Sequence, residues 1–139
     1  MKYKKSGNTY IIRLDRGEKI IESLNRFGTE NKVKLGYFFG IGALDEAELA
    51  HYTVENKKYT AKKFSQPLEI ISMLGNITAM DRKAYLHCHI ALSDEKMRSI
   101  AGHLKEGRIS ATCEIFLVEL IGSVSRKYDG ITGLNLMEI

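Results

Sequence analysis

The sequence predicts a single α+β domain spanning residues 1–139, in which one main N-terminal helix packs on a largely antiparallel β-sheet. Two observations support this prediction. One segment near the N-terminus has apolar residues at helical spacing, whereas most of the remaining chain consists of short apolar or alternating stretches bounded by turn residues. One early helix followed by many strands at hairpin spacing is typical of an α+β domain with an antiparallel sheet.

Length and composition agree with one globular domain. The 139 residues are 44% hydrophobic and 27% charged, with two Cys and no Trp. A chain of this length buries roughly two thirds of its unfolded surface, so it needs neither a disulfide nor a metal merely to fold. The N-terminus has no secretory leader, the charge-free stretch 35–44 is about half of a membrane helix, and two cysteines without a leader indicate reduced thiols. We therefore expect a cytoplasmic protein with no membrane partner.

The helix is predicted to begin after Asp15, because Asp15-Arg16-Gly17-Glu18 matches a capping box. Gly28 is a candidate end of the helix, with residues 29–31 as an alternative last turn. Apolar side chains recur on one face between these limits, at Ile20, Ile21, Leu24 and Phe27.

Strands are predicted for the remaining apolar stretches. Glycines inside residues 34–44 indicate bulges or close backbone approach rather than helix. Glu55-Asn56 is a candidate hairpin turn. Residues 93–108 are expected to form a polar connection, in which residues 94–100 make a helical turn. The predicted strands are 9–14, 34–44, 48–54, 57–64, 67–77, 85–92, 109–121 and 123–128.

Three of the four histidines are candidate metal ligands. His87 and His89 belong to a predicted strand, where residues two apart share a face with α-carbons about 6.6 Å apart, so both imidazoles can converge on one ion. His103 follows a connection long enough to return beside them, and the adjacent Gly102 permits a backbone conformation that other residues resist. Three neutral imidazoles and one water make an open zinc site, where zinc lowers the pKa of the water. The alternative is a histidine pair satisfied by hydrogen bonds alone, and His51 is expected to be structural or exposed.

Glu114 is a further candidate, because an ionised carboxylate in its apolar stretch is costly unless paired. It is a candidate partner or proton shuttle for a metal-bound histidine. Equally, it is a candidate for an ion pair at a subunit interface, and Glu69 poses the same question. Cys88 and Cys113 have apolar neighbours and are interpreted as inert core thiols. The sequence contains no phosphate loop, dinucleotide fingerprint or nucleophile elbow.

The formal net charge of +4 permits weak, nonspecific attraction to polyanions such as DNA. The basic residues gather at Lys2, Lys4 and Lys5 and within residues 57–63. The alternative that we favour for residues 57–63 is a solvated, lysine-rich hairpin that protects a sheet edge from pairing. No base-reading motif accompanies the charge.

Several motifs, taken together and in order, resemble the PPC domain family (plants and prokaryotes conserved), in its stand-alone prokaryotic type. The resemblance covers nearly the whole chain. Its motifs are Gly40-Ile41-Gly42-Ala43-Leu44, residues 69–77, Leu86-His87-Cys88-His89, Gly102-His103-Leu104-Lys105-Glu106-Gly107, residues 112–114 and residues 129–134.

The resemblance implies a homotrimer and a metal site formed by His87, His89 and His103 near a subunit boundary. It also implies a link to DNA, although the Arg-Gly-Arg-Pro hook by which plant relatives read the minor groove does not occur in this sequence. The expected function is thus a trimeric, zinc-bearing binding or regulatory module that associates weakly with DNA or a protein. The alternatives are a zinc-dependent metalloenzyme acting on a small molecule and a purely structural metal in the trimer.

Overall fold

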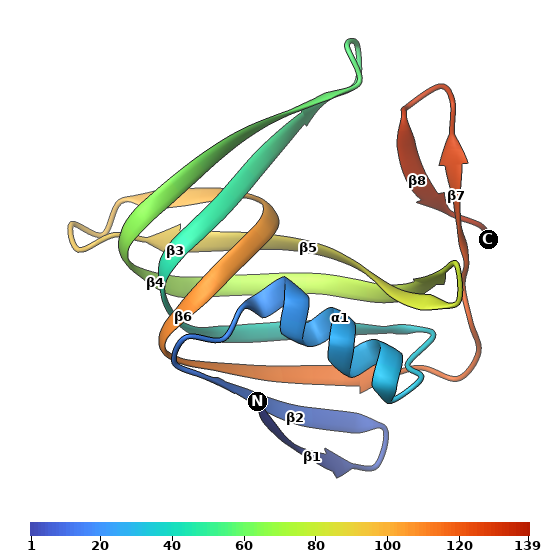
Figure 1. The fold of residues 1–139 in the computed structure, drawn as a ribbon, viewed down its shortest axis with the longest axis horizontal. Coiled ribbons are helices and arrows are strands. Elements are labelled where there is room, and N and C mark those ends of the chain that lie inside the picture. The colour runs from blue at the N-terminus through green and yellow to red at the C-terminus, as the bar shows by residue number, and fades with distance from the viewer.

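A computed structural model describes residues 1–139, and the chain forms eight strands and one helix (Figure 1). No helix has the length and apolar character that crossing a bilayer requires. The elements are β1 (Lys2–Ser6), β2 (Thr9–Asp15), α1 (Ile20–Glu30), β3 (Gly36–Thr53), β4 (Lys58–Met80), β5 (Lys83–Ser93), β6 (Ser99–Glu119), β7 (Arg126–Asp129) and β8 (Leu134–Met137).

Six of the strands form one antiparallel sheet in the order β1-β2-β6-β3-β4-β5. The sheet also closes on itself, because the first residues of β6 pair with the end of β5. The α+β prediction with a largely antiparallel sheet is therefore confirmed. Closure places residues from β5 and from the start of β6 side by side, although the sheet order separates these strands.

The longest strands bend where the sequence predicted breaks between strands. Predicted strands 34–44 and 48–54 form the single strand β3, and 57–64 and 67–77 form the single strand β4. Their pairing shifts register between Leu44 and Glu46, at the predicted break, and also between Gly40 and Gly42, where the glycines predicted a bulge. Such β-bulges bend a strand and increase its twist without ending it. The bends let β3, β4 and β6 curl over, which is how the sheet reaches closure.

The hydrophobic core lies between α1 and one face of the sheet. Ile20, Leu24 and Phe27 on the helix are fully buried, as predicted from their spacing. Gly28 does not end the helix, which continues to Glu30. Instead it permits close packing on the sheet, since an added Cβ would overlap Cδ1 of Ile77.

The predicted capping box does not cap the helix. Glu18 does accept a hydrogen bond from the Asp15 amide at 2.8 Å, but the helix begins two residues later, at Ile20, without a local side-chain cap. The cap comes from β6, where the Glu106 carboxylate accepts hydrogen bonds from the amides of Ile21 (2.9 Å) and Glu22 (3.2 Å). A negative charge at this position also favours the positive end of the helix dipole.

The connection predicted over residues 93–108 is much shorter in the structure. Asp94 makes a tight turn by accepting hydrogen bonds from the amides of Lys96 (2.9 Å) and Arg98 (3.0 Å). The helical turn predicted over 94–100 is therefore wrong, and β6 begins at Ser99. The edge strand β1 was not predicted, because its lysines gave it a polar sequence; such charges are common on exposed edges.

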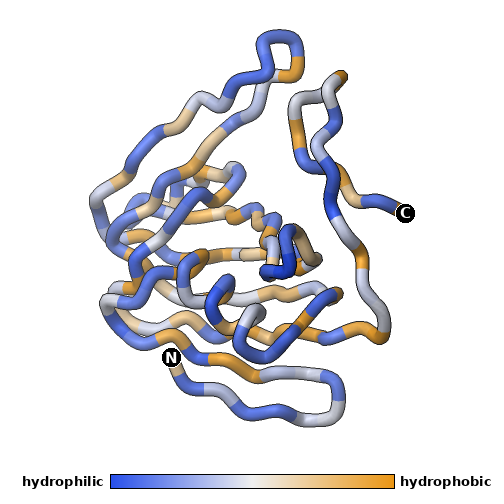
Figure 2. Tube along the Cα trace, turned by 45° about the vertical axis from the view of Figure 1, so that its right-hand side comes forward, coloured by the Kyte–Doolittle hydropathy of each residue, from blue (hydrophilic) through white to orange (hydrophobic).

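The lysine-rich residues 57–63 lie at the tip and along one side of the β3–β4 hairpin, whose turn includes Glu55 and Asn56 as predicted. Figure 2 shows that this tip is mainly hydrophilic. Beyond Lys58, β4 pairs only with β3 until Glu69, so its other side is a free edge. The lysines are exposed along that edge, in agreement with the solvated-hairpin interpretation.

The C-terminal strands β7 and β8 form a separate two-stranded hairpin that stands beside the tip of the β3–β4 hairpin (Figure 1). The prediction of a strand over 123–128 is thus only partly right, since β7 begins at Arg126. The Arg126 guanidinium fastens the hairpin to β4 by donating to Thr78 Oγ1 and Asn76 Oδ1, both at 2.8 Å. Tyr52 fastens its far end by donating to the carbonyl of Thr132 at 2.6 Å.

The cap supplied by Glu106 leads to a stability prediction. We expect Glu106→Ala to lower the free energy of unfolding by about 1–2 kcal/mol, because two amides of the first helical turn lose their acceptor. Urea denaturation followed by circular dichroism measures the change. Glu95→Ala is the matched control, since Glu95 is exposed and makes no hydrogen bond or ion pair. Equal effects of the two substitutions would contradict the cap.

Candidate metal centre

The structure brings the three predicted histidines together. His87 and His89 point to the same side of β5, and His103 on β6 is paired directly opposite His89. The Nε2 atoms of His87 and His89 are 3.2 Å apart. One ring nitrogen from each of the three histidines lies within 4.8 Å of the others. The cluster therefore depends on the pairing that closes the sheet.

The environment of the cluster favours neutral imidazoles. Burial, together with smaller contributions from His87, His89 and Lys105, lowers the pKa of His103 to about 4. Burial also lowers the pKa of His87, with smaller contributions from His89 and Arg126. Both rings are consequently neutral at pH 7, and neutral imidazole is the form that binds a metal.

The donor set fits a tetrahedral zinc ion. Nitrogens about 2.0–2.1 Å from a tetrahedral zinc lie about 3.3 Å from each other. The 3.2 Å separation of the His87 and His89 nitrogens is close to that value. No Asp, Glu or Cys belongs to the cluster. Three imidazoles leave the fourth position of a tetrahedral ion free for water or another ligand.

A cavity of about 430 Å³ lies beside the cluster. His87 and His103 form part of its wall, and Lys105 and Arg126 add two positive charges. Residues 133–137 of the C-terminal hairpin form another part. Sequence analysis missed Tyr59 and Arg126 here, because they are far from the histidines in sequence and belong to no motif.

The outer face of the sheet, opposite α1, carries apolar side chains up to the histidines. The strand pairing forms one continuous row that ends at His89. Leu74, which pairs with His89, is 60% exposed, and Phe39 is 46% exposed. The rings of Phe39 and Phe116 stack with centroids 5.5 Å apart. We call this surface the outer apolar face, defined by Ile11, Tyr37, Phe39, Ile41, Leu74 and Phe116.

Glu114 is not brought to the histidines within one chain. It is exposed on β6, opposite Ile41 on β3 and Arg13 on β2. Arg13 forms its ion pair with Asp15 instead, at 2.9 Å. Glu69 is also exposed and has no hydrogen bond or ion pair.

The remaining candidates occupy ordinary positions. Cys88 and Cys113 are free and buried, and burial raises the pKa of each thiol to about 12, which agrees with inert core thiols. His51 is exposed on β3. Gly102 does not adopt a positive φ, contrary to expectation. Instead, Gly102 lets the backbone of β6 lie close to β3, because an added Cβ would be 3.2 Å from the carbonyl oxygen of Ala50.

Fold and site together define a single-domain α+β protein with a three-histidine candidate metal centre on a self-closing antiparallel sheet. The model of the Plants and Prokaryotes Conserved (PCC) domain matches residues 1–121. The chain belongs to this family, which is the one that its motifs resemble. The match covers all three histidines and ends before the C-terminal hairpin.

Solved structures agree over almost the whole chain. A protein of Bacteroides thetaiotaomicron, provisionally described as DNA-binding, is 33% identical with a TM-score of 0.96, and covers 99% of this chain and 96% of its own. A metal-containing protein of Archaeoglobus fulgidus is 31% identical with a TM-score of 0.90 and complete coverage of both chains. A plant- and prokaryote-conserved protein of Pyrococcus horikoshii is 30% identical with a TM-score of 0.90, covering 99% and 95%.

A curated relative contains a similar segment within a much longer protein. The bifunctional protein GlmU of a Synechococcus strain is 29% identical over 127 residues, which is 89% of this chain. The chain spans only 19% of the length of that protein.

Proposed function

We propose that this protein is a homotrimeric binding module that holds one zinc ion per chain through His87, His89 and His103. The observation that carries the proposal is the convergence of three ring nitrogens within 4.8 Å of one another, with two of the rings kept neutral by burial. The relative from Archaeoglobus fulgidus, which has the same fold and is described as metal-containing, supports a metal in a protein of this fold. Zinc suits a purely imidazole donor set and leaves one ligand position open.

The first test is the metal content of the protein purified without a histidine tag. We expect about one zinc per chain in the wild type and at least a tenfold loss in His89→Ala, because two imidazoles rarely retain zinc. Plasma mass spectrometry measures both. His51→Ala is the matched control, since His51 is exposed on β3 outside the cluster. Wild-type protein without metal after incubation with zinc would refute the proposal.

The outer apolar face supports the homotrimer. Monomeric proteins rarely expose large contiguous apolar patches, and such patches usually mark interaction surfaces. Here the exposed side chains occupy neighbouring strands in one continuous surface, and the PCC family resemblance implies that the partner is a second copy of the chain. Because this surface reaches His89, subunits packed on it lie next to the metal centre, near the boundary expected from the resemblance.

A charge at the centre of the outer apolar face tests the assembly. We expect Leu74→Glu to convert trimers to monomers at micromolar concentration, because a buried unpaired carboxylate costs several kcal/mol. Light scattering during gel filtration gives the mass. Met97→Glu is the control, since Met97 is 83% exposed in the turn before β6 and lies off this face. A monomeric wild type, or a trimeric Leu74→Glu protein, would argue against this interface.

The open ligand position bears on the two alternative roles of the metal, which are a structural ion and a catalytic ion. A structural zinc is normally closed by four protein ligands, whereas a catalytic zinc retains a position for water. The adjoining cavity therefore supports the metalloenzyme alternative over a purely structural ion. Glu114 can act as a proton shuttle only if a neighbouring subunit brings it to the histidines. Its place on the outer face equally suits the other role weighed for it, an ion pair at the interface.

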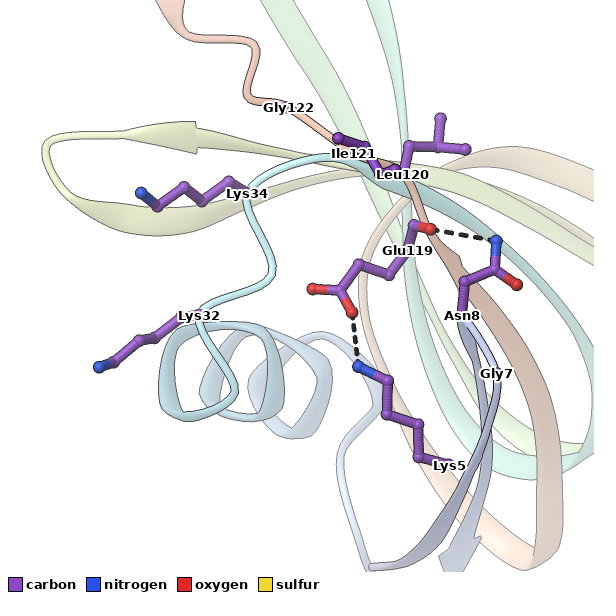
Figure 3. A pocket seen from close by; sticks show the side chains of 9 residues that line it. All are labelled: Lys5, Gly7, Asn8, Lys32, Lys34, Glu119, Leu120, Ile121 and Gly122. Carbon is purple, nitrogen blue, oxygen red and sulfur yellow. Dashed lines mark hydrogen bonds and ion pairs between the residues drawn. The ribbon is translucent and has the colours of Figure 1, made fainter.

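Weak association with DNA has a specific candidate surface. Four cations line one shallow hollow of about 340 Å³ near the end of α1 and the β4–β5 turn, and no acidic residue lines it. These are Lys32, Lys34, Arg82 and Lys83, none of which forms an ion pair. A neighbouring hollow shares two of them. Figure 3 shows that Lys32 and Lys34 extend away from the protein there, whereas Lys5 pairs with Glu119 at 2.8 Å.

Salt dependence tests this surface. We expect duplex DNA to bind weakly, with a logarithmic salt slope that falls by about 2 per chain in the double variant Lys32→Gln, Arg82→Gln, because each phosphate contact adds about 0.9. Fluorescence anisotropy at several salt concentrations measures the slope. The control is Lys62→Gln, Lys63→Gln on the β3–β4 hairpin, which removes the same charge. No binding at low salt, or equal effects of the two variants, would contradict the assignment.

A further inference from the structure

The cavity beside the histidines contains positive charge without any negative partner. Neither Lys105 nor Arg126 forms an ion pair, and no Asp or Glu lines the cavity. Lys105 Nζ lies 4.5 Å above the centre of the Tyr59 ring. The Arg126 guanidinium lies 4.8 Å from the centre of the Tyr85 ring. Aromatic rings orient these cations but do not neutralise them.

The Arg126 guanidinium still has donors to offer. It donates to the Thr78 hydroxyl, the Asn135 carbonyl and the Asn76 amide oxygen, all of them neutral acceptors. A guanidinium carries five N–H groups, so about two remain free. A partly buried charge without a counter-charge is costly, and an anion in the cavity would remove that cost.

The rest of the wall suits a small molecule. The Tyr59 hydroxyl has no hydrogen-bond partner within the chain and is available to a ligand. Leu134, Leu136 and Met137 supply an apolar side. The volume of about 430 Å³ lies in the range of small-molecule sites, which combine apolar walls with a few placed polar groups.

The C-terminal hairpin completes the wall of the cavity and is fastened to the β3–β4 hairpin. Lys57 Nζ donates to the carbonyl of Gly130 at 2.6 Å, and the Tyr52 hydroxyl donates to that of Thr132. Gly133 has a φ of +76°, and an added Cβ would lie 2.6 Å from the Tyr52 hydroxyl oxygen. The hairpin wall thus depends on glycine at this position.

We propose that this cavity binds a small anion, whose carboxylate or phosphate group lies between Lys105 and Arg126 beside the histidines. The position next to the open zinc ligand site rests on the proposed function. The attraction to an anion rests on Lys105 and Arg126 alone and exists without the metal. A dicarboxylate and a phosphate share the required charge, and the experiment distinguishes them.

The test is an NMR titration of ¹⁵N-labelled protein with succinate and, separately, with inorganic phosphate. Succinamide, which has the same skeleton and no charge, is the control ligand. We expect saturable shifts of the Tyr59, Lys105 and Gly133 amides with at least one of the two anions and none with succinamide. Lys105→Met should weaken binding roughly tenfold, the loss typical of one charge-assisted contact. Arg126 is left unchanged because it also fastens the hairpin.

Lys127→Met is the matched control variant, because Lys127 neighbours Arg126 but does not line the cavity. Equal weakening by Lys105→Met and Lys127→Met, or no saturable shift with either anion, would overturn the proposal. The titration is repeated on chelator-treated protein. Anion binding that persists there and still depends on Lys105 supports the cavity even if the protein holds no zinc. If zinc-loaded protein binds neither anion, the proposed anion site is refuted, whereas the proposed metal centre is unaffected.

Discussion

The register between β5 and β6 is the constraint on which the rest of the structure depends. It closes the sheet and sets His103 opposite His89. A slip by one residue would turn every side chain of one strand to the other face. The core prevents that slip, because Cys88, Ile90 and Leu92 alternate with the histidines and are buried. The geometry of the candidate metal centre is therefore a consequence of hydrophobic packing on the opposite face.

The features that could be predicted from the sequence are those that depend on local patterns along one element. Alternation within residues 85–92 is local, so it correctly set His87 and His89 on one face and Cys88 in the core. The glycines within residues 34–44 correctly indicated the bulge between Gly40 and Gly42. The bend between Leu44 and Glu46 was instead predicted as a break between strands, because that bulge is defined by the partner strands. Glu106 caps the helix by a hydrogen bond to Ile21, which is 85 residues away in the sequence. Arg126 fastens the hairpin by a hydrogen bond to Asn76, which is 50 residues away. Such contacts leave no periodic signal in the sequence.

The outer apolar face connects the proposed trimer interface with the candidate metal centre. A row of apolar side chains crosses the sheet and ends at His89, and the parallel row through Tyr37 and Asn76 ends at His87. In the proposed trimer, packing on this face would remove water from one side of the histidines. Lower water content would strengthen electrostatic interactions at a metal bound there. The cavity on the side of the C-terminal hairpin would still give access to the histidines.

The positive charge of the site favours a metal centre that binds a further ligand over a purely structural zinc site. Structural zinc usually has thiolate ligands that cancel its charge, whereas three imidazoles leave both positive charges. Histidine ligands commonly donate to a carboxylate, but no acidic group joins this cluster. Lys105 and Arg126 add charge of the same sign beside it. Zinc in this centre would raise the positive potential that the cavity already has, and a bound anion would balance it.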